Sequence, residues 1–258
     1  MVTRWSGIIR NPQWLTEGKY ASGELAQILE KHIKTVVAHF RGKIFAWDVV
    51  NEAFDELQPG KLRSTIWRDQ PGIGLAGNGS SYIERCFRWA HEADPQALLF
   101  YNAAGAEVVN PKSDAIYAMV RDFRQRRIPI DGAGFPMHIE QLRADVASIS
   151  ANIKRFTALG VEVHITEMDV ALPVGPNRNP RFEDLQLQAD IYREVATACL
   201  SHPDARRSRH GASRTNIHGS DRTRSMRKAG RCGLIGTMGQ SLPTRRRGMH
   251  WRQGVVSR

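Results

Sequence analysis

Residues 43–52 read KIFAWDVVNE, a short apolar run that ends in two polar side chains, Asn51 and Glu52. A short apolar run of this kind, rich in valine and aromatic residues, predicts a buried strand. The two polar residues stand where that strand should end and the chain should turn. This stretch therefore predicts a buried strand whose last residues face a site.

The same pattern recurs three times further along the chain. Strands are predicted over 97–102 (ALLFYN), within 130–139 and over 161–170 (VEVHITEMDV). Their polar ends carry Asn102, His138, Glu167 and Asp169. Apolar residues near a 3.6-residue period predict helices over 22–39, 81–93, 113–126, 146–159 and 184–199. Strands that alternate with helices predict an α/β fold, a parallel sheet covered by helices.

Two parallel architectures fit this alternation, a doubly wound sheet and part of an eight-stranded (β/α)8 barrel. In a barrel, the groups that face a ligand gather at the C-terminal ends of the strands. All four predicted strands carry polar residues at that end. A doubly wound sheet would rarely use four consecutive strand ends in this way, so the pattern favours the barrel.

The net charge of +11 suggests a nucleic-acid partner until the charge is located. Residues 201–258 hold 14 Lys and Arg against 2 Asp and Glu, whereas residues 1–200 hold 23 against 24. The chain is thus a nearly neutral body joined to a basic tail rich in arginine, serine and glycine. We expect no specific nucleic-acid partner, and disorder in the tail, whose composition cannot form a core.

Short sequence patterns argue against three further classes: membrane-spanning, disulfide-rich and metal-binding proteins. No apolar stretch is long enough to span a bilayer, and the N-terminus shows no signal peptide, so we expect no membrane partner and leave localisation open. The cysteines Cys86, Cys199 and Cys232 are odd in number and widely spaced. We expect them to form no disulfide framework, and we expect no metal site.

Two carboxylates at predicted strand ends, Glu52 and Glu167, could carry chemistry. Cleavage of a glycosidic bond needs two carboxyl groups, one to protonate the leaving oxygen and one to attack or to activate water. Both acids could equally be structural partners of Lys or Arg, since ion-pair networks also contain buried acids.

Several segments together resemble glycoside hydrolase family 10, the retaining endo-1,4-β-xylanases built on a (β/α)8 barrel. The resemblance covers about residues 10–204. It rests on segments found at 11–15 (NPQWL), 47–52 (WDVVNE), 94–102 (DPQALLFYN), 111–123 (PKSDAIYAMVRDF), 128–135 (IPIDGAGF), 165–169 (ITEMD) and 202–204 (HPD). The resemblance implies a xylan or xylo-oligosaccharide substrate, no cofactor and a monomer; family members are commonly secreted.

The resemblance also implies a role for each matching residue. Glu52 matches the general acid/base and Glu167 the nucleophile. Asn51 matches the residue that binds the sugar 2-hydroxyl, His138 the histidine that hydrogen-bonds the nucleophile, and Asp169 the aspartate that orients this histidine. Such a donor beside a nucleophile favours its ionised form. For a retaining enzyme, the carboxyl oxygens of the two acids should lie about 5–5.5 Å apart.

Two further residues complete the expected site, and three positions depart from the family pattern. We expect Asn102 to bind substrate and Trp47 to support the site. The family usually has Gln two residues before this histidine, where this chain has Pro136. The family usually has Asp-Tyr after the asparagine, where this chain has Ala103 and Ala104. These departures should weaken sugar binding.

The expected barrel is incomplete. The first two strands and the eighth should be missing and the third garbled, with an aberrant N-terminus at 1–9, a partial catalytic barrel at 10–204 and a disordered basic tail at 205–258. Suitable codons for residues 1–10 and 210–219 would encode the family's third-strand and last-strand motifs in a shifted frame. We hypothesise that both ends are frame-shifted.

The main function expected is therefore retaining hydrolysis of internal β-1,4 bonds of xylan, with activity in doubt for so short a barrel. One alternative is a retaining glycosidase that acts on another β-1,4-glycan. The other is a catalytically dead remnant whose basic tail binds polyanions. Hydrolysis of xylan, and retention on heparin, would separate these functions.

Overall fold

The computed structural model describes residues 11–173 and 179–202, and the backbone of residues 232–235. The helices of this part are α1 (Gln13–Thr16), α2 (Ser22–His39), α3 (Ser81–Ala93), α4 (Pro111–Gln125), α5 (Val146–Ala158) and α6 (Phe182–Leu200), with a short 3₁₀ helix, η1 (Ala76–Asn78). The strands are β1 (Ala46–Asn51), β2 (Leu98–Asn102), β3 (Gly132–Ile139), β4 (Glu162–Val170) and β5 (Cys232–Ile235). Every helix and strand predicted from the sequence is present, with ends that differ by a few residues.

The strands form one sheet in the order β1-β2-β3-β4-β5, and all neighbouring pairs are parallel. A doubly wound sheet reverses its strand order at a switch point. Here the spatial order follows the chain order throughout, as it does around a (β/α)8 barrel. The structure is thus an incomplete barrel, and the doubly wound alternative is excluded.

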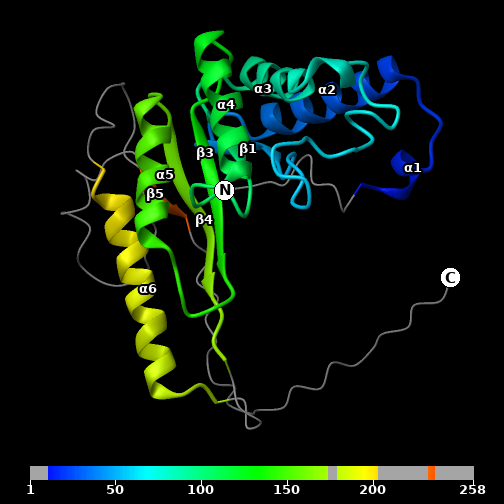
Figure 1. Cartoon of the computed structure of the whole chain (residues 1–258). Coiled ribbons are helices and arrows are strands. Elements are labelled where there is room, and N and C mark those ends of the chain that lie inside the picture. Colours follow the sequence, from blue (N-terminus) through cyan, green and yellow to red (C-terminus); the bar gives the residue numbers. More distant parts are fainter. Residues whose placement is uncertain (1–10, 174–178, 203–231, 236–258) are drawn as a thin grey trace, which may run out of the picture.

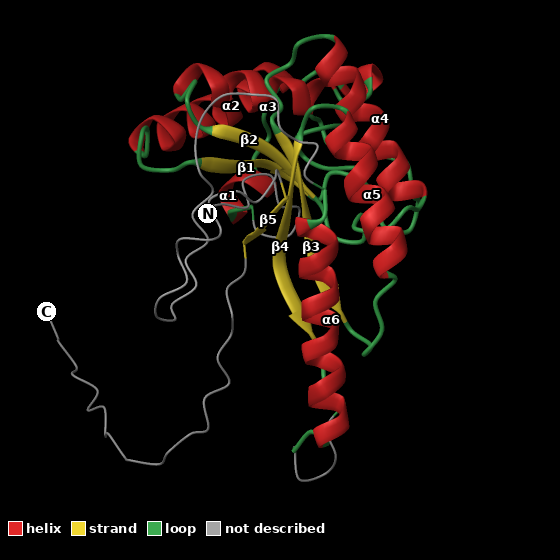
Figure 2. Cartoon of the chain, turned by 90° about the vertical axis from the view of Figure 1, so that its left-hand side faces the viewer, coloured by secondary structure: helices red, strands yellow, loops and turns green. Residues whose placement is uncertain are grey.

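Helices α2 to α6 lie along one side of the sheet (Figures 1 and 2). The strands between them are short and almost wholly buried; all six residues of β1 are buried. None of the helices in the described ranges is long and apolar enough to cross a membrane.

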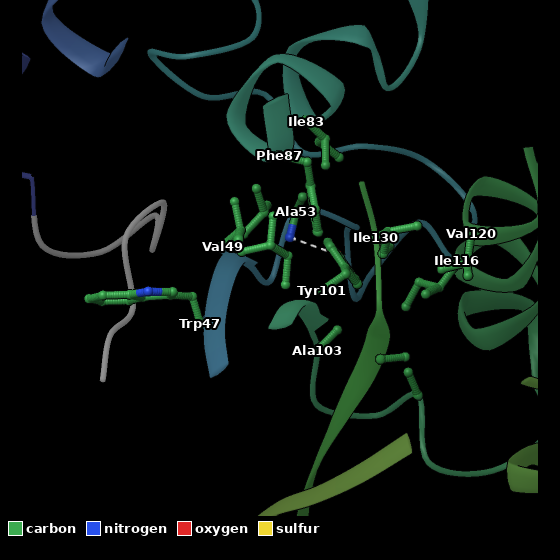
Figure 3. Packing of buried hydrophobic residues seen from close by; sticks show 14 of the residues in the cluster. Trp47, Val49, Ala53, Ile83, Phe87, Tyr101, Ala103, Ile116, Val120 and Ile130 are labelled. Carbon is green, nitrogen blue, oxygen red and sulfur yellow. Dashed lines mark hydrogen bonds between the residues drawn. The ribbon is translucent and has the colours of Figure 1, made fainter. Parts of the chain in front are cut away.

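The core lies between the sheet and this helical layer (Figure 3). On α2 the buried side chains Leu25, Leu29, Ile33 and Val37 follow one another at four-residue steps, which keeps them on one helix face. Between α3 and α4 the rings of Phe87 and Phe123 meet edge to face with centroids 6.1 Å apart. Trp47, which we expected to support the site, is 1% exposed and belongs to this core.

Two irregularities interrupt the parallel ladders just before the polar strand ends. Between Asp48 and Val50, β1 advances two residues while β2 advances one. Between Pro136 and His138, β3 advances two residues while β4 advances three. An extra residue in one strand bends it and re-aims the side chains that follow. Both bulges therefore turn the strand ends that carry the expected site.

The basic tail departs from expectation in one place. We expected little regular structure over 205–258, but β5 pairs with β4, with Leu234 opposite Ile165. Backbone hydrogen bonds to the open edge of β4 stabilise a strand whatever the surrounding charge. The rest of the expected tail, and residues 1–9, lie outside the described residues.

We expected no disulfide framework, but Cys199 on α6 is disulfide-bonded. Wide spacing in the sequence does not keep cysteines apart once helices and strands pack against each other. Cys86 on α3 is free and buried, and burial raises the pKa of its thiol to about 12.

Candidate active site

The backbone turns sharply at each of the two candidate catalytic acids. Glu52, directly after β1, has φ of 57°, and Glu167, within β4, has φ of 50°. A side chain with a β-carbon rarely adopts this left-handed conformation, and such strain concentrates at functional sites. The turn at Glu52 is held because its N–H donates to the Asn102 carbonyl at 3.0 Å and the next N–H, of Ala53, to the Tyr101 hydroxyl at 3.0 Å.

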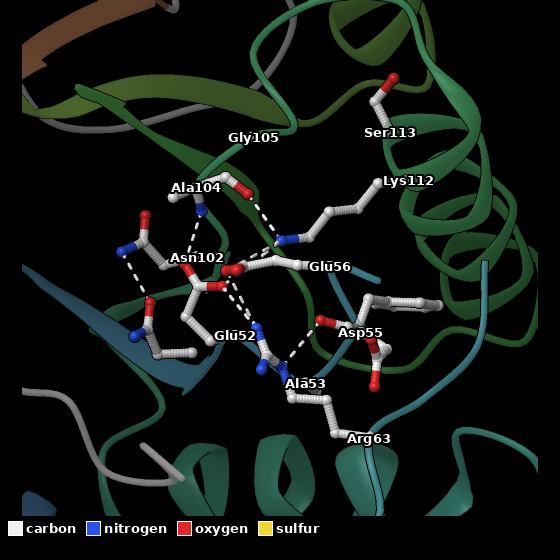
Figure 4. Close-up of polar contacts among 12 residues, drawn as sticks. Glu52, Ala53, Asp55, Glu56, Arg63, Asn102, Ala104, Gly105, Lys112 and Ser113 are labelled. Atoms are coloured by element: carbon white, nitrogen blue, oxygen red, sulfur yellow. Dashed lines mark hydrogen bonds and ion pairs between the residues drawn. The ribbon is translucent and has the colours of Figure 1, made fainter. Parts of the chain in front are cut away.

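The carboxylate of Glu52 lies among one amide and two cations (Figure 4). Its Oε1 accepts the N–H of Ala104 at 2.6 Å. Its Oε2 lies 3.4 Å from the Lys112 ammonium and 3.8 Å from the Arg63 guanidinium. The side chain is 22% exposed, so water and a substrate can still reach it.

A chain of hydrogen-bonded side chains links β1, β2 and β4 beside Glu52. The Asn102 side-chain N–H donates to Asn51 Oδ1 at 3.0 Å, and the Thr166 hydroxyl donates to Asn102 Oδ1 at 3.0 Å. Asn102 is 1% exposed and Asn51 4%, and contact of either side chain with substrate stays a prediction. Asn51 is oriented by this chain.

The second acid, Glu167, lies with His138 and Asp169 on β3 and β4. His138 Nδ1 is 2.8 Å from Asp169 Oδ2, and His138 Nε2 is 3.7 Å from Glu167 Oε2. An imidazole held by one carboxylate presents its other nitrogen to the second. The structure thus brings these three predicted site residues together, with the second nitrogen of His138 facing Glu167 beyond hydrogen-bond distance.

Two more carboxyl groups lie near these clusters. Burial, and next the charge of Glu167, raise the pKa of Asp48 on β1 to about 7. Burial also raises the pKa of Glu107, against the opposing charges of Lys112 and His138. Both carboxyl groups thus hold a proton more readily than a free carboxyl group does.

The departures from the family pattern also have defined places. Pro136 is buried in β3 opposite Thr166, and the buried Ala103 follows β2 with its N–H bonded to the Gly134 carbonyl at 3.1 Å. Ala104 contributes its backbone to Glu52, which any residue type could do.

Sequence reasoning missed Lys112, Arg63 and Thr166. Lys112 lies in a segment that carries the family resemblance, but it precedes the predicted helix, where a lysine is usually solvated. Arg63 lies in the irregular segment between β1 and α3, and no periodicity marks it. Lys112 and Arg63 are identified only by their distances to Glu52, and Thr166 only by its distance to Asn102.

Comparison with known proteins settles the family. Residues 5–210 match the sequence model of Glycosyl hydrolase family 10. The chain belongs to this family. The match is slightly wider than the 10–204 expected from the sequence, and the predicted resemblance is confirmed.

Individual relatives agree with this membership. The chain is 42% identical over 195 residues to endo-1,4-beta-xylanase B of Thermotoga neapolitana, which covers 76% of this chain and 53% of that protein. Its structure is similar to native xylanase 10B from Thermotoga maritima, with a TM-score of 0.72 and 33% identity over 91% of this chain and 61% of that one. Xylanase 10B from Thermotoga petrophila in complex with xylobiose is similar at a TM-score of 0.72 and 32% identity, over 91% and 60%. The chain therefore spans less than two thirds of these relatives.

Proposed function

We propose that this chain carries the catalytic carboxylates of a retaining endo-1,4-β-xylanase. The observation that carries the proposal is the pairing of Glu167 with a histidine that Asp169 orients, in the same sheet as Glu52. Two differently held carboxyl groups are what a double displacement at a sugar needs.

In the first step, Glu167 attacks the anomeric carbon while Glu52 donates its proton to the leaving glycosidic oxygen. The carbon–oxygen bond breaks and a glycosyl ester of Glu167 forms. In the second step, Glu52 takes a proton from water, and the water oxygen displaces Glu167. The configuration at the anomeric carbon is retained, and neither step requires a metal or cofactor.

The neighbouring residues fit supporting roles in this reaction. Asn51, oriented by Asn102, would bind the sugar 2-hydroxyl beside the scissile bond. His138 would donate to Glu167 and favour its ionised form. The separation of about 5–5.5 Å between the two carboxyl groups stays a prediction, as does the monomeric state.

Xylan is proposed as the substrate because the relatives that the chain matches are named as xylanases, and one of the solved relatives holds xylobiose. Pro136, Ala103 and Ala104 replace residues that the family usually has, so weak binding of the sugar is expected. A shortened barrel should also hold the acids less accurately, and a misplacement of about 1 Å can cost roughly 100-fold in rate.

Hydrolysis of soluble xylan tests the proposal, first with this chain and then with residues 11–202 joined between the N-terminal barrel strands and the last barrel strand of the Thermotoga neapolitana enzyme. We expect little activity from the chain alone and clear activity from the joined protein. Proton NMR should show the β-anomer of the product first, as retention requires.

The variant Glu167→Ala of the joined protein should lose at least about 10⁴-fold in kcat, because no nucleophile remains. Glu30→Gln, on the outer helix α2, serves as the matched control and should keep full activity. An inactive joined protein that folds, or a Glu167→Ala variant with undiminished activity, would overturn the assignment.

A further inference from the structure

Lys112, at the start of α4, is a buried cation that the mechanism above does not use. It is 5% exposed, and a lysine is almost never buried to this extent without partners. Its ammonium donates to the Ala104 carbonyl at 2.7 Å and lies 3.4 Å from Glu52 Oε2 and 3.9 Å from Glu56 Oε1. Its charge is therefore directed at the candidate acid/base.

The contacts of Lys112, Ala104 and Glu52 close a ring (Figure 4). Ala104 donates its N–H to one oxygen of Glu52, at 2.6 Å, and its carbonyl accepts from Lys112. Lys112 in turn faces the other oxygen of Glu52. A carboxylate held at both oxygens keeps little rotational freedom, so the ring defines where Glu52 points.

The position of Lys112 is itself fixed by the capping of α4. Asn110 Oδ1 accepts the N–H of Ser113 at 2.8 Å, and Pro111 occupies the first turn. The preceding loop is anchored to α5, where the buried Asn152 side chain donates to the carbonyls of Ala106 at 2.7 Å and Glu107 at 3.2 Å. Lys112 thus sits on a rigid support.

We propose that Lys112 is a positioning residue for Glu52, which it holds, together with the backbone of Ala104, in the orientation needed for proton transfer. This inference rests on the acid/base role of Glu52 in the proposed function.

The other charged groups around Glu52 do not replace Lys112. Arg63 lies 3.8 Å from Glu52, but it is more closely paired with Glu56, at 3.0 Å, and donates to the Phe54 carbonyl at 3.0 Å. The charge of Lys112 lowers the pKa of Glu107, which burial raises, and the Tyr101 hydroxyl accepts the N–H of Ala53 at 3.0 Å. Among these groups, Lys112 alone bonds Ala104 as well as Glu52.

The proposal predicts a specific kinetic pattern, measured on the full chain with Lys112→Met. A leaving group as poor as a sugar needs the proton of Glu52, whereas a dinitrophenolate does not. For xylo-oligosaccharides we expect kcat/KM to fall about 10- to 100-fold. For 2,4-dinitrophenyl β-xylobioside, kcat/KM should stay within about threefold while kcat falls, because only the water-activating step then needs Glu52.

Lys34→Met is the matched control. Lys34 also pairs with two glutamates, at 2.6 Å and 2.7 Å, but on the outer helices α2 and α3. Lys34→Met should leave kcat/KM unchanged on both substrates. Equal losses of kcat/KM on both substrates in Lys112→Met would indicate a merely structural role and overturn the proposal, and rescue by Lys112→Arg on the poor leaving group would support it.

An NMR measurement decides the proposal even if the chain hydrolyses neither substrate. In the full chain labelled with [15N]alanine, the Ala104 amide reports its hydrogen bond to Glu52, and Glu52→Gln assigns the signal. We expect Lys112→Met to speed exchange of this amide by about tenfold or more, with Lys34→Met unchanged.

Lys112→Gln, which keeps a donor for the Ala104 carbonyl, serves if Lys112→Met fails to fold, and a smaller acceleration is then expected. An unchanged Ala104 amide in a folded variant would overturn the proposal. Lack of hydrolysis by the joined protein described under the proposed function, with the NMR change present, would instead contradict only the proposed function.

Discussion

At the scale of single residues, the two candidate acids combine chemistry with backbone strain. Both have φ between 50° and 57°, where a β-carbon is disfavoured by about 1–2 kcal/mol. The strain is tolerated because bulges and hydrogen bonds hold the turns. It also aims two carboxyl groups away from the buried strands that carry them.

This strain predicts an unusual order of stability for two variants of the nucleophile. Glu167→Gly should be more stable than Glu167→Ala by about 1 kcal/mol, because glycine adopts this conformation freely. Urea unfolding measures the free energy of unfolding of both variants. Because both lack the carboxylate, the effect of its loss cancels in the comparison. The opposite order, normal for a strand, would show that the left-handed conformation is absent.

Asp48 predicts how stability depends on pH. Its pKa is raised from 3.8 to about 7 in the folded chain, so the folded state holds the proton more tightly than the unfolded state. Its contribution is fully present below about pH 4 and is lost as the pH rises through about 7. By pH 8 the loss reaches about 4 kcal/mol at most.

Asp48→Asn removes this titration, so it should be more stable than wild type at pH 8 and similar at pH 4.5 in urea unfolding. Glu167→Gln should reduce the pH dependence of the wild type, because the Glu167 charge contributes to the shift. Parallel stability curves for Asp48→Asn and wild type would refute the assignment.

At the scale of elements, β3 has to pass close to the hydrogen-bonded side chains of Asn102 and Thr166, which orient Asn51. A β-carbon on Gly134 would lie 2.3 Å from Asn102 Oδ1 and 3.4 Å from the Thr166 methyl group. Because Gly134 has no side chain, the Asn102 side chain fits between β1 and β4. The packing of three strands thus depends on one missing side chain.

Gly134→Ala should therefore displace Asn102 and lower the free energy of unfolding by about 1–3 kcal/mol. Thermal or urea unfolding measures the loss. Gly23→Ala on α2, where the added β-carbon meets nothing within 4 Å, is the matched control and should be neutral or slightly stabilising. A Gly134→Ala variant as stable as Gly23→Ala would contradict the close approach.

At the scale of the whole molecule, the described sheet is part of a barrel whose far edge is covered by β5. The sheet order places β5 beside β4 and gives β4 a neighbour on both sides. Strand edges left unpaired favour association with other chains. The short strand thus protects the element that carries Glu167.

Leu234→Pro removes a backbone donor from β5 and should weaken its pairing with β4, at a cost of about 0.5–1.5 kcal/mol for one lost hydrogen bond. The expected outcome is a lower midpoint of thermal unfolding and faster amide exchange along β4. Hydrogen exchange measured by mass spectrometry on peptides from 162–170 provides the check. Unchanged protection of these peptides would show that β5 contributes nothing to the sheet.

Local patterns in the sequence were sufficient for most of the elements and for choosing the pair of candidate acids. Helical and strand periods predicted α2 to α6 and β1 to β4, and the family segments identified Glu52, Glu167, His138 and Asp169. These signals are local because a helix or strand buries one face at a regular spacing. The disulfide of Cys199 and the strand β5 escaped such reasoning.

The arrangement of the site was decided only by the tertiary structure. Lys112 meets Glu52 across 60 positions of the chain, and Thr166 meets Asn102 across 64. No periodicity encodes such contacts, because they arise when separate strands and a loop pack at one edge of a sheet. The sequence by itself determined that β1 to β4 form and which acids they and the turn after β1 carry; packing determined that Asn102 is buried, that Glu52 is held by a lysine, and where both carboxylates point.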